Sequence, residues 1–109
     1  MVIATRHLKL QLPAEEIDIS VRIFLPEADN GSWRCGYEID WPDGKRSSAA
    51  VGIDSVQALF LALQKIGIEI YTSDYHQQGQ LIWFEADQGY GFPVTRNVRD
   101  RLVGADQHL

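Results

Sequence analysis

The chain has 109 residues, of which 45% are hydrophobic and 23% are charged, a length and composition typical of one globular domain with its own core. No apolar stretch approaches the roughly 18 residues that span a bilayer, which excludes a helical membrane protein. The net charge of -5 disfavours nucleic acid, because phosphate contacts depend on Lys and Arg. We therefore expect a single soluble domain over residues 1–109.

Four strands are predicted in the first half of the chain. The first covers about residues 3–12 and ends at Pro13. Residues 17–25 and 32–41 alternate apolar and polar side chains with the period of two that a half-buried strand requires. The segment 26–31, which contains Asn-Gly, and Pro42-Asp43-Gly44 are predicted turns, and the second leads into a fourth strand at 45–53. Such short connections favour antiparallel pairing.

One long helix is predicted to follow. Asp54 is a suitable N-cap, and helical character is expected to persist to about Tyr75 and to stop by Gly79. Apolar residues recur at helical spacing and are predicted to face the sheet: Val56, Leu59, Phe60, Leu63, Ile66, Gly67 and Ile70.

Two shorter elements are predicted to complete the chain, a fifth strand over residues 80–85 and a short helix ending at Val103. The predicted fold class is therefore α+β, with a four- to five-stranded antiparallel sheet whose one face is covered by the long helix.

The predicted core lies between this helix and the sheet. It comprises Ile19, Val21, Ile23, Cys35, Tyr37, Ile39, Val51, Leu59, Leu63 and Ile66. Cys35 alternates in phase with Trp33 and Tyr37, so we expect a buried and unreactive thiol. As the single cysteine it cannot form an internal disulfide, and the N-terminal residues lack the apolar run of a signal peptide. Both observations favour a cytoplasmic location.

Four stretches of the chain resemble a family of small bacterial proteins of unassigned function. They are Tyr37 to Gly44, Val56 to Gly67, Tyr71 to His76, and Gly89 to Val94. The resemblance covers most of the chain and implies no reaction, cofactor or catalytic residue.

No motif for metal or nucleotide chemistry is found. His7, His76 and His108 have no His, Cys or carboxylate at a metal-ligand spacing, and Gly89-Tyr90-Gly91 lacks the third glycine of a dinucleotide loop. We expect no catalytic residue, no metal and no cofactor. The arginines near residues 96–101 are interpreted as a solvated surface rather than an anion site.

A polar and aromatic cluster is the candidate ligand site. Its members lie where the long helix, the following turn and the fifth strand are predicted to meet: Tyr71, Asp74, Tyr75, His76, Trp83 and Tyr90. One interpretation is a pocket in which His76 titrates near neutral pH. The other is that these residues end the helix and seal the edge of the core.

A second apolar line on the long helix is a candidate interface. Leu61 and Ile68 are seven residues apart, far in angle from the predicted core stripe, and Tyr75 continues the line beside Gln64. Two alternatives remain open here. The line contacts a second copy or another partner, or the C-terminal segment folds back across it.

The charge distribution favours a protein-binding module over an enzyme. No Lys or Arg occurs between Lys65 and Arg96, whereas four acidic residues do: Glu69, Asp74, Glu85 and Asp87. Such a stretch suits a basic protein partner, as for an immunity or inhibitor protein. The alternative is a small-molecule-binding protein or minor enzyme that uses the Tyr75 and His76 region.

Overall fold

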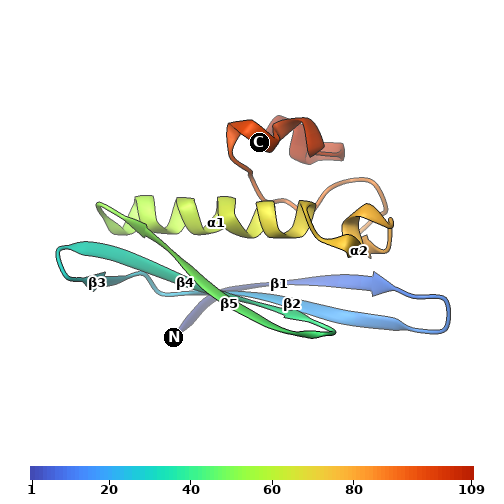
Figure 1. The fold of residues 1–109 in the computed structure, drawn as a ribbon, viewed down its shortest axis with the longest axis horizontal. Helices are drawn as coiled ribbons and strands as arrows, with labels where there is room; N and C mark the ends of the chain where they lie inside the picture. Colours follow the sequence, from blue (N-terminus) through green and yellow to red (C-terminus); the bar gives the residue numbers. More distant parts are fainter.

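The computed structural model describes residues 1–109 and arranges them in three layers (Figure 1). An antiparallel sheet is the first layer, the main helix lies along one of its faces, and the C-terminal segment lies on the side of the helix away from the sheet. The strands are β1 (Val2–Gln11), β2 (Glu16–Phe24), β3 (Glu27–Asp29), β4 (Ser32–Trp41), β5 (Gly44–Gly52) and β6 (Leu81–Ile82). The helices are α1 (Ser55–Tyr71) and α2 (Asp74–Gln77), followed by two 3₁₀ helices, η1 (Arg96–Arg101) and η2 (Gly104–His108). None of them is long and apolar enough to cross a membrane.

The α+β class is confirmed, but the sheet has six strands rather than four or five. Its order is β3-β4-β2-β1-β6, and β5 pairs with β4. The unexpected strand is β3, which lies in a segment predicted to be a turn. Only Asn30 and Gly31 take positive φ angles, 49° and 83°, so the turn needs just these two residues. Glu27–Asp29 is thereby free to pair with β4.

The predicted phase of β2 and β4 is correct, and that of β5 is wrong. The inward residues of β2 and β4, Cys35 among them, are buried as expected. In β5, however, Ala50 lies opposite Cys35 and is the core residue. Val51 points to the other face because side chains alternate along a strand, and 58% of its surface is exposed.

The buried face of helix α1 is only partly the one predicted: Ile66, Gly67 and Ile70 are buried as predicted, and the rest of the face is shifted around the helix. Four residues spaced by four are fully buried: Ala58, Ala62, Ile66 and Ile70. Leu59 and Leu63 are only half-buried at the flank of this row, and Val56 and Phe60 are exposed. The small alanine side chains let the helix approach the sheet closely. At Gly52 of β5, a Cβ atom would lie 2.5 Å from the backbone nitrogen of Ala58.

The predicted helix end, fifth strand and C-terminal helix also need correction. Helix α1 ends at Tyr71, and the Ser73 hydroxyl accepts a hydrogen bond from the His76 backbone and caps the separate helix α2. Strand β6 stops at Ile82, two residues before Phe84, whose φ of 63° is incompatible with an extended strand. Two 3₁₀ helices replace the one C-terminal helix.

The C-terminal segment reaches α1 at Gly67. A Cβ atom at this position would lie 2.0 Å from the carbonyl oxygen of Pro93, so only glycine allows the two backbones to approach so closely. The residues of the candidate interface, Leu61, Gln64, Ile68 and Tyr75, are half-buried. Their contact with a second copy stays a prediction.

Candidate functional site

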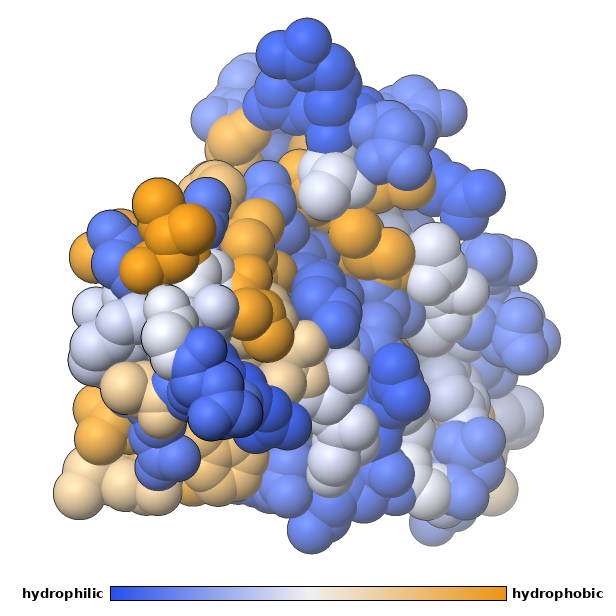
Figure 2. Space-filling view, turned by 60° about the vertical axis from the view of Figure 1, so that its left-hand side comes forward, coloured by the Kyte–Doolittle hydropathy of each residue, from blue (hydrophilic) through white to orange (hydrophobic).

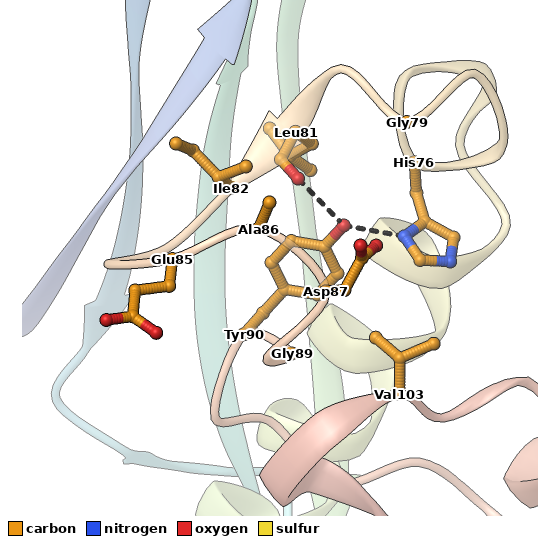
Figure 3. Close-up of a pocket in the computed structure, with 10 residues that line it drawn as sticks. All are labelled: His76, Gly79, Leu81, Ile82, Glu85, Ala86, Asp87, Gly89, Tyr90 and Val103. Carbon is orange, nitrogen blue, oxygen red and sulfur yellow. Dashed lines mark hydrogen bonds between the residues drawn. The ribbon is translucent and has the colours of Figure 1, made fainter.

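A small pocket lies where α2, β6 and the loop after β6 meet (Figure 3). His76 and Tyr90 line it together with Glu85 and Asp87, and its volume is about 40 Å³. A volume of this size holds one or two water molecules, whereas pockets for drug-sized ligands measure about 300–1,000 Å³. The pocket is therefore a small hollow beside a surface loop.

His76 and Tyr90 form the hydrogen-bonded pair of this pocket. The Tyr90 hydroxyl donates to the carbonyl oxygen of Leu81 at 3.2 Å and lies 2.6 Å from Nδ1 of His76 (Figure 3). When the hydroxyl donates to Leu81, the His76 tautomer that is protonated at Nδ1 completes the pair by donating to the Tyr90 oxygen. Burial lowers the pKa of His76, and the positive charge of Arg101 lowers it further. A neutral imidazole is thus favoured.

Asp106 binds the backbone next to this pocket, and it was not predicted from the sequence as a site residue. This buried carboxylate of η2 accepts hydrogen bonds from the backbone amides of Tyr90 and Gly91, both at 2.7 Å. It also accepts one from the Tyr71 hydroxyl at 2.6 Å. Gly89 leaves room for it, since a Cβ atom there would lie 2.5 Å from the carboxyl carbon. One side chain therefore joins η2, helix α1 and the loop residues Tyr90 and Gly91.

The six residues of the predicted ligand cluster separate into three places. Tyr71, His76 and Tyr90 lie together, with ring centroids 4.8 to 5.4 Å apart. Tyr75 instead stacks on Trp41 with centroids 5.2 Å apart, and it borders an open hollow with Asp74. The sixth residue, Trp83, packs over the guanidinium of a β1 arginine. The structure thus brings only half of the cluster together.

The loop that follows β6 displays an aromatic side chain. We call Trp83 to Asp87 the display loop. The backbone amide of Glu85 donates to the carbonyl of Trp83 at 2.8 Å, and Phe84 between them has a φ of 63°. This arrangement is a γ-turn, which is rare and strained for a residue with a bulky side chain. Phe84 points outward and 85% of its surface is exposed.

No three His, Cys, Asp or Glu side chains lie close enough to share a metal ion. His76 and Tyr90 of the pocket are hydrogen-bonded to each other, and no fully buried side-chain nitrogen or oxygen lacks a hydrogen-bond partner. The chemistry that stands out is an exposed ring flanked by carboxylates at the surface.

Comparison with known proteins identifies a family without assigning an activity. Residues 4–94 match the family model described as a domain of unknown function, DUF6968. The chain belongs to this family. The match confirms the resemblance to an uncharacterised family. No curated protein and no solved structure matches the chain. The DUF6968 match includes the display loop and ends before Asp106, which binds the backbone of Tyr90 and Gly91.

Acidification is expected to destabilise the folded protein through His76. Its pKa in the folded state is lowered by burial from an unfolded value of about 6.5. Above about pH 6.5 both states are neutral at this site, and as the pH falls the unfolded state binds the proton first, so stability declines. We expect His76→Gln to remove this component. Urea unfolding of both proteins at about pH 7.5 and about pH 5 measures it, and an identical pH dependence in the two would contradict it.

Proposed function

We propose that this DUF6968 domain is a non-enzymatic protein-binding module and that the display loop is its contact surface. The observation that carries this proposal is the exposure of Phe84 in a strained turn. Large aromatic side chains dominate the binding energy of many protein interfaces. An aromatic ring that points into solvent gains little for folding, so its burial against a partner is the more favourable use of it.

The charges of the display loop favour a basic partner. Glu85 and Asp87 follow Phe84 in the display loop, and both are exposed. The ion pairs within the chain involve other residues, on the sheet and at Glu69 of α1. Unpaired carboxylates around an aromatic anchor attract Lys and Arg of a partner and disfavour acidic proteins. An immunity or inhibitor role toward a basic target is consistent with this surface.

Other surfaces of the protein support the proposal less specifically. Hydrophobic surface is also visible at the end of the molecule where β5 leads into α1 (Figure 2), and exposed Ile53, Val56 and Phe60 belong to this end. Unlike Phe84, none of these three residues has a positive φ angle that directs its side chain outward. We further propose a bacterial cytoplasmic location, because the single cysteine is free and buried.

The alternative of a small-molecule site at Tyr75 and His76 has weaker support. These residues face different hollows. The hollow at His76 has a volume of about 40 Å³, too small for most metabolites.

Affinity capture with matched variants tests the proposed function. Phe84→Ser removes the exposed ring of the display loop, and Phe60→Ser removes an exposed ring of α1 and is the control. We expect the wild type and the control to retain the same basic protein from lysate. Phe84→Ser should weaken binding by about tenfold or more, as for a hot-spot residue. Equal retention by all three proteins would contradict the proposal.

A further inference from the structure

Arg6 occupies a position where the sheet pattern calls for an apolar residue. It lies opposite Val21 on the core-facing side of β1, in phase with the buried Leu8 and Leu10. Its guanidinium lies between two aromatic rings, 4.1 Å from the centroid of Trp83 and 4.9 Å from that of Phe92. Such stacking holds the planar group in one orientation.

Only one end of this guanidinium is used within the protein. Nη1 donates to the carbonyl oxygens of Tyr90 and Gly91, both at 3.1 Å. Nε and Nη2 have no acceptor, and Arg6 has no ion pair with a carboxylate. Asp106 is its electrostatic partner at longer range, but both oxygens of that carboxylate already accept other hydrogen bonds.

The free donors are accessible from outside. No fully buried side-chain nitrogen lacks a partner in this protein, so Nε and Nη2 of the half-buried Arg6 reach solvent-accessible space. Burial lowers the pKa of Arg6, but a guanidinium remains charged at physiological pH.

An adjacent cavity is largely apolar. It has a volume of about 250 Å³ and is lined by Arg6 together with Ile23, Leu63 and Phe92. Helix α1 packs mainly on β4 and β5, so the cavity lies beside the helix, between Leu63 and the part of the sheet formed by residues 4–6 and Ile23. Leu63 is half-buried for the same reason.

We propose that this Arg6 cavity binds a small carboxylic acid with an apolar body. Nε and Nη2 lie on the same edge of a guanidinium, where they match the two oxygens of a carboxylate. The apolar walls take the rest of the ligand, as an apolar cavity of about 150 Å³ takes benzene. Neither Trp83 nor Phe84 lines this cavity, but the cavity adjoins the display loop of the proposed function, because Trp83 stacks on Arg6.

Titration with a matched pair of ligands tests the site. Octanoate carries the carboxylate, and octanamide has the same chain without the charge. The titration is followed by the backbone amide NMR shifts of the full chain. Octanoate should bind saturably and change the shifts of residues 4–6, Ile23, Leu63 and 91–92. Octanamide should bind at least about tenfold more weakly than octanoate, because hydrogen bonds between charged groups are stronger than those of an uncharged amide. Equal binding of the two, or octanoate shifts confined to other surfaces, would overturn the proposal.

Two variants separate the charge from the cavity. Arg6→Met removes the guanidinium, and Leu63→Trp fills the cavity and leaves Arg6 in place. Each should weaken octanoate binding by about tenfold or more. Arg34→Met, at an exposed arginine of β4, should leave binding unchanged. If Arg6→Met fails to fold, the Leu63→Trp variant and the octanamide comparison still test whether octanoate binds in the Arg6 cavity. Full octanoate affinity in a folded Leu63→Trp protein would reject the site.

Discussion

Asp106→Asn is expected to lower the free energy of unfolding by about 3 kcal/mol, because a buried donor without an acceptor costs about 1–3 kcal/mol. Asp106 accepts hydrogen bonds from the backbone amides of Tyr90 and Gly91 and from the Tyr71 hydroxyl. An asparagine of the same shape keeps one oxygen and turns an NH₂ group toward donors. At least one of the three hydrogen bonds is therefore lost, and the NH₂ group then faces another donor and repels it.

The matched control for this substitution is Asp100→Asn. Asp100 lies in η1 and is exposed, so its change should affect stability by less than about 0.5 kcal/mol. Urea unfolding followed by circular dichroism measures both variants. Equal stability of Asp106→Asn and the wild type would show that η2 does not dock on Tyr90 and Gly91.

Gly67→Ala is expected to destabilise the protein by about 1–3 kcal/mol, the usual cost of overpacking. Helix propensity alone predicts the opposite, since alanine is favoured over glycine inside a helix by about 1 kcal/mol. The reason for the reversal is space. The new Cβ atom would lie 2.0 Å from the carbonyl oxygen of Pro93 and 3.2 Å from Cγ1 of Val94. Either the C-terminal segment or the helix must move.

Gly36→Ala provides the control for Gly67→Ala. Gly36 lies in β4, and a Cβ atom there would have its nearest neighbours at 3.7 Å, an ordinary contact distance. This change should be neutral or slightly stabilising, because glycine weakens a strand. Thermal unfolding of both variants checks the pair. A higher melting temperature for Gly67→Ala would mean that the C-terminal segment does not cross α1.

The parts of the fold that follow from local pattern could be predicted from the sequence. Alternation located β2 and β4 and placed Cys35 in the core, and Asp54 does cap α1 by accepting the Gln57 amide. The pattern of large apolar residues did not predict the full contact face of α1, because small residues make the closest contacts there. Ala58 and Ala62 carry the close contact of α1 with the sheet, yet alanine gives little signal in a hydrophobic pattern.

The site was only partly predictable, since its central contacts join distant parts of the chain. Asp106 is 16 residues from Tyr90 and 35 from Tyr71, and nothing in its neighbourhood marks it as a buried acceptor. Arg6 did leave a signal, because it is a charge in the apolar phase of the first strand. A charged residue at such a position needs partners, and the loop after β6 supplies them.

Hydrogen exchange at two backbone amides tests most directly whether the C-terminal segment holds the loop that carries the site. The amides of Tyr90 and Gly91 lie outside any helix or strand and are bonded only to the Asp106 carboxylate. If η2 is docked as described, both should exchange as slowly as amides in the centre of β2 and β4. Exchange at the rate of an exposed loop would contradict the three-layer arrangement and the docking of η2 on Tyr90 and Gly91.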